Sequence, residues 1–261
     1  MPDGMCYVML GRSERLQDIF IKCNEEFDMS AIRCNQEALS ESKRLEDIFE
    51  KNKQEKNKKG KSFWKISYLN IRSLIAHHED LSNDNAINDS DVCGFGETWL
   101  KENETVSIKG FSGESHFANF GKGKGQASFT KMDLLSKPNI FASESCSAIH
   151  LKTNQFDVVF LYLSNNYDKN LVQSLLNSWI QVDIPTIVMG DINENFFENS
   201  SFKEFMSTKR FQQMIEKPTH IKGSTLDHIY INQMMLEKNV FAEQNCCYYS
   251  DHDIISLYVR K

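Results

Sequence analysis

The sequence contains no long hydrophobic run. No stretch approaches the roughly 18 uninterrupted apolar residues of a membrane-spanning helix, and the amino-terminal segment MPDGMCYVMLGR lacks the basic-then-apolar pattern of a signal peptide. We therefore expect an intracellular protein, nuclear or cytoplasmic and not secreted, with no membrane partner. The composition, 40% hydrophobic and 11% aromatic over 261 residues, is ordinary for a globular protein large enough to be an enzyme.

Zinc-site and phosphate-loop patterns are also absent. The 7 cysteines show no paired two-residue spacing, so we expect reduced and mostly buried thiols. The segment GKGKG at 121–125 lacks the spacing and the following Ser or Thr of a phosphate-binding loop, which predicts a turn before a strand and no ATP binding. Because the formal net charge is -6, an anionic substrate must be met by local charges or by a metal.

A charged segment divides the chain. Residues 50–62, EKNKQEKNKKGKS, contain no apolar side chain and cannot drive their own ordering by burial. We interpret 49–62 as a solvated linker, with a nucleic-acid-contacting arm as the alternative. The sequence therefore predicts three parts, which are a small amino-terminal segment at 1–48, the linker at 49–62 and a globular domain at 63–261.

The globular part reads as short β-rich segments separated by turns and a few helices. Period-two or continuous apolar patterns predict strands at 63–71, 91–97, 126–131, 147–153, 156–164, 185–193, 225–232 and 253–259. An amphipathic stripe predicts a helix in 168–182, and Ser201 with Glu204 forms a capping box that opens another. Because strands outnumber helices, we expect an α/β sandwich of two packed mixed sheets flanked by helices, and not a doubly wound parallel sheet.

Polar and charged residues stand where the predicted strands end or begin. These residues are Asn70, Glu97, Asp191, Asn193, Asp227, Asp251 and His252. Any one of them alone is more often a turn residue or a helix cap. Charged side chains are rarely buried unless they are paired or bound to a metal, so their repetition at strand ends predicts one shared polar site.

The residue types suit phosphodiester chemistry with a hard cation. Magnesium prefers carboxylate and amide oxygens, which Asn70 and Glu97 provide. Hydrolysis also needs a group that orients the attacking water, groups that stabilise the added negative charge, and an acidic partner for any histidine involved. The residues that remain supply these functions: Asp191, Asn193, Asp227 and His252.

An ordered series of short motifs resembles the endonuclease/exonuclease/phosphatase superfamily. The motifs are LNIRSL, GETWL, LYLSNN, GDIN, TLDHIYI and YSDHD, and they run from about residue 63 to the carboxyl terminus. The resemblance implies the DNase I-like four-layer sandwich. It also implies that Asn70 and Glu97 bind Mg²⁺ (with Mn²⁺ as the alternative), that Tyr162 contacts phosphate, and that Asp251 binds metal or orients water.

The same resemblance implies the remaining roles in the reaction. Asp191 with Asn193 matches the pair that orients the attacking water and steadies the transition state, while Asp227 matches the acid that supports the essential histidine, His252. Gly96 stands where abasic-site endonucleases usually carry a glutamine, which argues against repair activity at abasic sites.

Two further resemblances point to a mobile element. GETWL, KPTHIKGSTLDHIYIN and GKGKGQASF resemble the endonuclease domains of non-LTR retrotransposons and of Helitron-like elements. CYVMLGRSERLQDIFI followed by IRCNQEALSESKRLEDI is similar to the last motif and tail of a Helitron-type DNA helicase. We therefore interpret residues 1–48 as a truncated helicase remnant that cannot act as a motor, because it lacks a phosphate-binding loop.

These observations lead to one functional expectation and two alternatives. We expect a magnesium-dependent endonuclease that nicks DNA and, as the resemblance implies, leaves a 3′ hydroxyl and a 5′ phosphate. One alternative is hydrolysis of a phosphorylated lipid or sugar, since a fold does not fix its substrate. The other is a catalytically inactive DNA-binding module. The sequence predicts neither the oligomeric state nor the DNA site.

Overall fold

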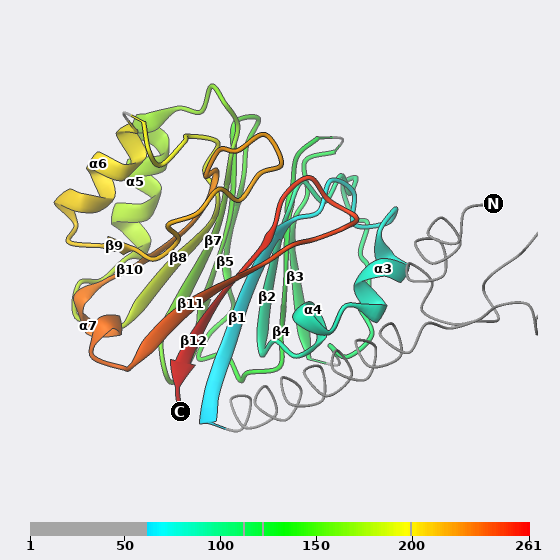
Figure 1. Cartoon of the computed structure of the whole chain (residues 1–261), viewed down its shortest axis with the longest axis horizontal. Helices are drawn as coiled ribbons and strands as arrows, with labels where there is room; N and C mark the ends of the chain where they lie inside the picture. Colours follow the sequence, from blue (N-terminus) through cyan, green and yellow to red (C-terminus); the bar gives the residue numbers. More distant parts are fainter. Residues whose placement is uncertain (1–61, 112, 122, 199) are drawn as a thin grey trace, which may run out of the picture. The chain divides into compact units, whose positions relative to one another are not determined.

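Two six-stranded mixed β-sheets pack against each other in the computed structural model, which describes residues 62–261 except 112, 122 and 199 (Figure 1). The first sheet has the order β11 (Val240–Asn245), β12 (Ile254–Arg260), β1 (Phe63–Asn70), β2 (Val92–Gly96), β4 (Gln126–Thr130) and β3 (Glu114–Ala118). The second has the order β5 (Asn139–Ala142), β6 (Cys146–Lys152), β7 (Asp157–Leu163), β8 (Thr186–Asp191), β10 (Asp227–Ile231) and β9 (Gln212–Gln213).

Each sheet has one parallel pair at its centre. β1 pairs with β2 in the first sheet and β7 with β8 in the second, whereas the other neighbouring strands are antiparallel. The antiparallel neighbours β12 and β10 therefore begin at the edge where the parallel strands end. A hydrogen bond from Asn70, the last residue of β1, to Asp191, the last residue of β8, joins these edges of the two sheets.

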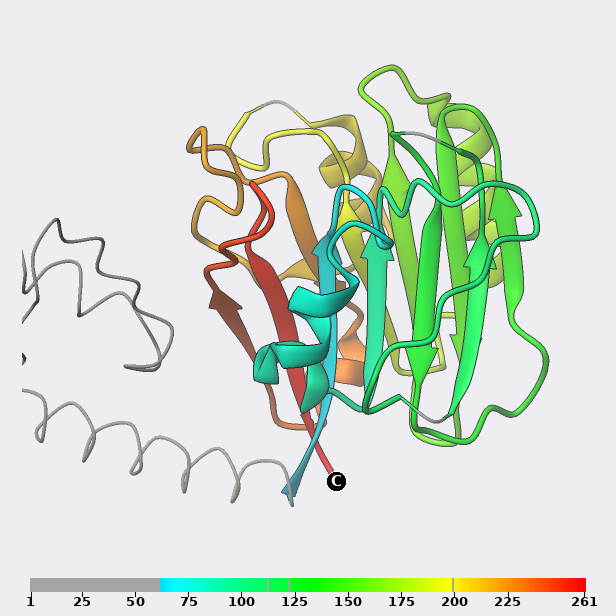
Figure 2. The ribbon, with the colours of Figure 1, turned by 90° about the vertical axis from the view of Figure 1, so that its right-hand side faces the viewer.

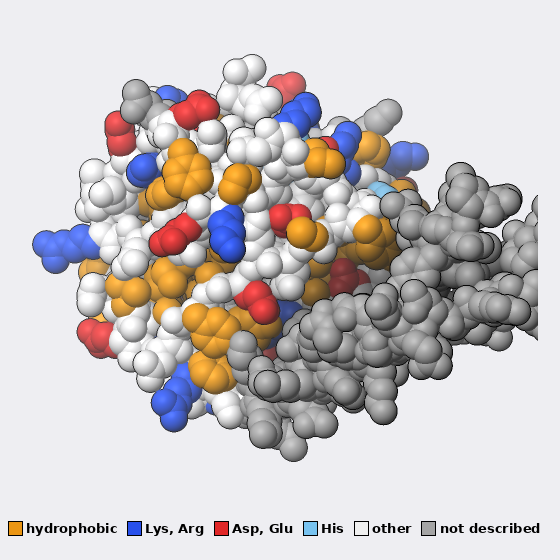
Figure 3. All heavy atoms as spheres, viewed as in Figure 1, with side chains coloured by type: hydrophobic (Ala, Val, Ile, Leu, Met, Phe, Trp, Pro, Cys, Tyr) orange, Lys and Arg blue, Asp and Glu red, His pale blue; other side chains and the backbone are white. Residues whose placement is uncertain are grey.

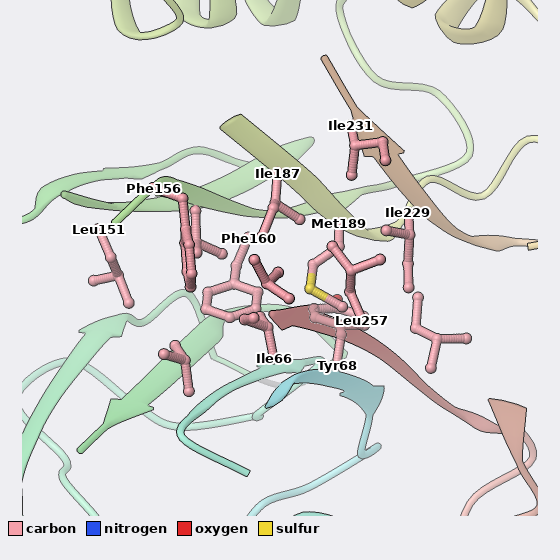
Figure 4. Close-up of a cluster of buried hydrophobic side chains, with 14 of the residues drawn as sticks. Ile66, Tyr68, Leu151, Phe156, Phe160, Ile187, Met189, Ile229, Ile231 and Leu257 are labelled. Atoms are coloured by element: carbon pink, nitrogen blue, oxygen red, sulfur yellow. The ribbon is translucent and has the colours of Figure 1, made fainter. Parts of the chain in front are cut away.

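Apolar side chains from both sheets fill the space between them. β7 and β8 are buried along their whole length and carry nearly continuous apolar runs, as expected for strands covered on both faces. Tyr68 and Phe160 stack across the two sheets with ring centroids 6.2 Å apart, and Figure 4 shows them among Ile66, Met189 and Leu257. Each large buried side chain contributes about 1.5–3 kcal/mol, so this core fixes how the sheets face each other.

Helices cover the outer faces of both sheets. α3 (His78–Asn83) and α4 (Asn85–Asn88) lie in front of the first sheet in Figure 2, with Leu81 and Ile87 buried beneath them. α5 (Lys169–Trp179) and α6 (Ser201–Thr208) cover the second sheet through a separate apolar cluster, and the short α7 (Gln233–Leu236) follows β10. The result is a layered arrangement of helices, sheet, sheet and helices.

The start of α6 differs from the prediction by one residue. Ser200 is the N-cap, because its Oγ accepts a hydrogen bond from the Lys203 N–H at 3.0 Å. Ser201 instead donates its hydroxyl to Glu194 at 2.9 Å. Two adjacent serines satisfy the same sequence criterion for a cap, so the prediction of Ser201 was wrong.

The architecture confirms the predicted α/β sandwich of two mixed sheets with outer helices. Each predicted strand is present, while β3, β5, β9 and β11 were not predicted. The helicase remnant at 1–48 and nearly all of the linker at 49–62 lie outside the described residues and stay predictions. Within the described part of the chain, none of the helices has the length and apolarity needed to cross a membrane.

Candidate active site

The polar residues predicted from the sequence meet at the shared edge of the two sheets. Asn70 and Glu97 come from the ends of β1 and β2, and Asp191 comes from the end of β8. Asp227 opens β10, directly opposite Asp191 in the ladder, and His252 lies just before β12. The topology brings these groups together because parallel strands end, and their antiparallel neighbours begin, at the same place.

Asn70 links two carboxylates that belong to different sheets. Its Nδ2 lies 3.0 Å from Glu97 Oε1 and 2.8 Å from Asp191 Oδ2. Glu97 has a left-handed backbone with φ of 48°, a conformation that costs a non-glycine residue free energy and that concentrates at functional sites. The indole N–H of Trp99 donates to the second oxygen of Glu97 at 3.3 Å. The two acids are therefore held close together by one amide group.

Asn193 fixes the orientation of the Asp191 carboxylate. The Asn193 backbone N–H donates to Asp191 Oδ1 at 3.0 Å, and its side-chain amide lies 3.3 Å from Oδ2 and 2.7 Å from the carbonyl of Leu163. This turn uses a left-handed φ of 54°, which asparagine tolerates better than most residues. Burial and the charge of Asp227 raise the pKa of Asp191 to about 7, against the opposing effects of His252, Asn70 and the Asn193 N–H.

His252 forms a buried pair with Asp227. The ring Nδ1 lies 2.8 Å from Asp227 Oδ2, and both side chains are almost wholly buried. Burial alone would lower the pKa of His252, but the charge and hydrogen bond of Asp227, together with the charges of Asp191 and Asp251, raise it to about 10. Asp227 is itself anchored by its backbone N–H, which donates to Thr219 Oγ1 at 3.0 Å. The imidazole is thus oriented with Nε2 toward the site and is protonated at neutral pH.

Tyr162 joins the site from β7. Its hydroxyl donates to the carbonyl of Gly123 at 3.2 Å and lies 3.5 Å from Glu97 Oε1. Burial and the charges of Glu97 and Asp191 raise the pKa of Tyr162 well above its ordinary value. The phenol therefore stays protonated and acts as a hydrogen-bond donor.

Asp251 takes a different position from the other acids. Its Oδ2 lies 2.6 Å from Arg72 Nη1 and 3.5 Å from His220 Nε2, and no hydrogen bond joins its side chain to Asn70 or Glu97 among the described residues. Sequence reasoning did not single out Arg72 or His220. Neither Arg72 nor His220 belongs to a periodic apolar pattern that would mark it as a site residue. Their position inside the motifs LNIRSL and KPTHIKGSTLD was the one feature of the sequence that could have indicated them.

The ligand types fit a hard divalent cation. Glu97 offers carboxylate oxygens and Asn70 an amide oxygen, the donors that Mg²⁺ prefers. Asn70 turns its nitrogen toward the two carboxylates that it links, while its oxygen accepts only from the Arg72 N–H at 3.3 Å, so an ion bound through that oxygen requires the amide to rotate. On the face in Figure 3, acidic and basic side chains of the described residues are interspersed without a patch of one sign.

The known proteins that resemble this chain were found through its structure. No protein-family model matches the sequence, and no curated protein matches it significantly. The 3′ phosphatase NExo from Neisseria, solved with a product DNA hairpin, aligns with a TM-score of 0.61 and 13% identity over 76% of this chain and 100% of that one. An endonuclease/exonuclease/phosphatase family protein from Leptotrichia buccalis aligns with a TM-score of 0.57 and 16% identity over 76% and 100%.

A third similar structure is the endonuclease domain of TRAS1, a telomere-specific non-LTR retrotransposon. It aligns with a TM-score of 0.56 and 13% identity over 76% of this chain and 98% of that domain. Identity this low establishes a common fold and nothing finer. The described domain therefore has the DNase I-like α/β fold that endonuclease/exonuclease/phosphatase proteins adopt.

Proposed function

We propose that this protein is a divalent-metal-dependent phosphodiester hydrolase that nicks DNA, of mobile-element origin. One observation carries the proposal. A carboxylate–amide–carboxylate group (Glu97, Asn70, Asp191) lies beside the buried pair of Asp227 and His252, with ligand atoms of Asp191, Asp227 and His252 within 4.8 Å of one another. DNA is favoured as the substrate because one similar structure holds a DNA hairpin and another is a retrotransposon endonuclease. The motif order in the sequence supports the same choice.

Asp191 is the group that orients and deprotonates the attacking water. Burial and the charge of Asp227 raise the pKa of the Asp191 carboxylate, which makes it basic enough to accept a proton from water. The Asn193 backbone N–H donates to Asp191 Oδ1, so the orientation of the Asp191 carboxylate and the direction of its remaining lone pairs are fixed. The fixed direction supplies the alignment that makes an in-line attack efficient.

His252 and Tyr162 stabilise the charge that develops on the phosphate. His252 Nδ1 is taken by Asp227, so Nε2 presents a proton to a non-bridging oxygen. The protonated phenol of Tyr162 provides a second donor from the opposite sheet. A cation held by Asn70 and Glu97 would supply Lewis-acid stabilisation to the phosphate and the leaving oxygen.

A supercoiled-plasmid nicking assay tests the proposal. We expect purified protein to nick the plasmid with Mg²⁺ and with Mn²⁺ but not with EDTA, and we expect Glu97→Ala and His252→Gln to lose the activity. His150→Gln is the matched control, because His150 and Asp157 form another buried pair at 2.9 Å and Asp157 lies at the start of β7, the opposite end from the site. This control should lose stability but keep metal-dependent nicking.

The other outcomes separate the remaining alternatives. A folded protein that binds DNA without nicking it would favour the inactive module. Release of phosphate from a phosphoinositide or sugar phosphate, with an intact plasmid, would reassign the substrate while leaving the chemistry of the site unchanged.

A further inference from the structure

The Asp251 carboxylate is held from two sides by residues that have no assigned role. Arg72 Nη1 lies 2.6 Å from Oδ2, and His220 Nε2 lies 3.5 Å from the same oxygen. The other oxygen, Oδ1, is shielded from solvent and has no hydrogen-bond partner in the described chain. Arg72 and His220 come from separate loops, one after β1 and one before β10, so the arrangement exists only in the folded domain.

The backbone of the His220 loop fixes the tautomer of the ring. The Lys222 N–H donates to His220 Nδ1 at 3.1 Å, so that nitrogen carries a lone pair and the proton of the neutral ring is on Nε2. The backbone that carries the ring is also held, because the Gly223 N–H donates to the His220 carbonyl at 2.8 Å and the Ile221 N–H to the Asp251 carbonyl at 2.9 Å. The neutral ring therefore has its Nε2–H 3.5 Å from Asp251 Oδ2, measured from the nitrogen.

This tautomer argues against a metal ion at the same place. Side-chain atoms of His220, Asp251 and His252 lie within 4.8 Å of one another, close enough for three ligands of one ion. A metal-binding histidine, however, normally donates its other N–H to an acceptor. His220 Nδ1 instead accepts from the backbone N–H of Lys222, so in the neutral ring neither nitrogen of His220 has a free lone pair for an ion.

Arg72 connects this cluster to the other half of the site. It follows Asn70 by two residues, its backbone N–H approaches the Asn70 side-chain oxygen at 3.3 Å, and its left-handed φ of 48° turns the chain toward Asp251. Ser250 closes the connection from the other side by donating to the Asn70 carbonyl at 2.6 Å. The position of Asp251 is thereby tied to the residues expected to bind the cation.

We propose that Arg72 and His220 are positioning residues that hold the Asp251 carboxylate in place beside His252. This role rests on the proposed hydrolase function. Arg72 donates to Oδ2 at 2.6 Å and His220 Nε2 lies 3.5 Å from the same oxygen, so the carboxylate is constrained from two sides. Neither residue needs to touch the substrate.

A first experiment tests the arrangement without any activity. We expect the ¹⁵N shifts of the His220 ring in the wild-type protein to show the Nε2–H tautomer at neutral pH. The Nδ1–H tautomer would overturn the proposal, because the ring would then offer Asp251 no proton.

A second experiment tests the role through kinetics. His220→Leu and Arg72→Met should each lower kcat for plasmid nicking by about tenfold, the effect of losing one hydrogen bond to a charged group, with little change in KM. His220→Gln, whose amide can replace the Nε2–H, should keep most of the activity. Thermal unfolding of each variant shows that the domain remains folded.

The Asp251→Asn background gives the decisive comparison. If His220 and Arg72 act through Asp251, neither substitution should lower kcat further in that background. An equal loss in both backgrounds, or an effect confined to KM, would show direct contact with the substrate and overturn the proposal. If the wild-type protein does not nick the plasmid, the proposed function is refuted. The ¹⁵N measurement of the His220 tautomer does not depend on activity and still tests the arrangement around Asp251.

Discussion

Replacing Asp227 with asparagine removes the charge that keeps His252 protonated. The ring nitrogen and the carboxylate oxygen are 2.8 Å apart, and both side chains are buried. The pKa of His252 stands at about 10 although burial alone would place it below 6.5. The difference between a pKa of 6.5 and one of about 10 corresponds to a preference for the protonated ring on the order of 5 kcal/mol. Without the carboxylate, we expect the pKa to fall toward 6.5, since burial lowers it while the charges of Asp191 and Asp251 still raise it.

The pH dependence of kcat measures this change. If the reaction uses ionised Asp191 and protonated His252, kcat should rise with pH on the acid side, where Asp191 loses its proton, and fall as the pH passes about 10, where His252 loses its proton. In Asp227→Asn the alkaline fall should move to near neutral pH. Compared with the wild type, the loss in kcat should be small in mildly acidic solution and grow with pH, reaching about 10³-fold as the pH approaches 10.

The reasoning has a clear point of failure. If the alkaline limb of Asp227→Asn stays near pH 10, Asp227 does not set the charge of His252. A uniform loss at every pH would indicate misplacement of the ring instead of a change in its protonation. Asp157→Asn, which alters the distant buried pair with His150, controls for the general cost of removing a buried acid.

Four further outcomes follow from the same geometry. The raised pKa of His252 stabilises the fold fully below about pH 6.5, and this stabilisation is lost as the pH rises through about 10. The difference in unfolding free energy between wild type and Asp227→Asn, measured in urea titrations, should therefore shrink over that range. A constant difference would contradict the pairing of Asp227 with His252. Gly96→Ala would place a Cβ 2.1 Å from Tyr68 Oη and should cost about 2 kcal/mol of stability, part of which Tyr68→Phe should restore in the double variant. Asn193→Asp adds a negative charge beside Asp191 and should move the acid limb of kcat to higher pH, whereas an unmoved limb would show that Asp191 is not the base. Glu97→Gln should raise the Mg²⁺ concentration for half-maximal nicking at least about tenfold, and an unchanged midpoint would exclude Glu97 as a ligand.

The buried strands and most of the site could be predicted from the sequence because burial leaves a local pattern. β7 and β12 are buried over nearly their whole length, which forces apolar residues at almost every inward position. A polar residue at the end of such a run, such as Asp191 after TIVMG, is then conspicuous. Several such residues at strand ends are enough to indicate a site, even before the strand order is known.

The strands that were missed leave no such pattern. β3 and β5 are mostly exposed, β11 is only half-buried along its length, and β9 spans two residues. β3, β5, β9 and β11 are also the outermost strands of their sheets. Edge strands tolerate polar residues on both faces, so their sequences resemble loops. These strands form by pairing with a neighbouring strand, and that pairing depends on the tertiary structure, which the local sequence does not show.

The contacts around Asp251 and Gly96 were out of reach for the same reason. Arg72 and Asp251 are 179 positions apart and meet only because two loops end at one edge. The absence of a side chain at Gly96 has a physical cause that the sequence alone conceals, since the hydroxyl of Tyr68 from the neighbouring strand fills that space. Pairwise complementarity of this kind depends on the register between β1 and β2.

The pairing of the two sheets explains why one edge holds the complete site. Each sheet has a central parallel pair with an antiparallel strand beside it, and each contributes the ends of that pair and the start of that neighbour. The first sheet thereby supplies Asn70, Glu97 and His252, and the second Tyr162, Asp191 and Asp227. Neither sheet carries both members of the Asn70–Asp191 or the Asp227–His252 contact. The spacing of the candidate site residues is therefore set by the apolar core between the sheets, so packing around Tyr68 and Phe160 determines the geometry of that edge.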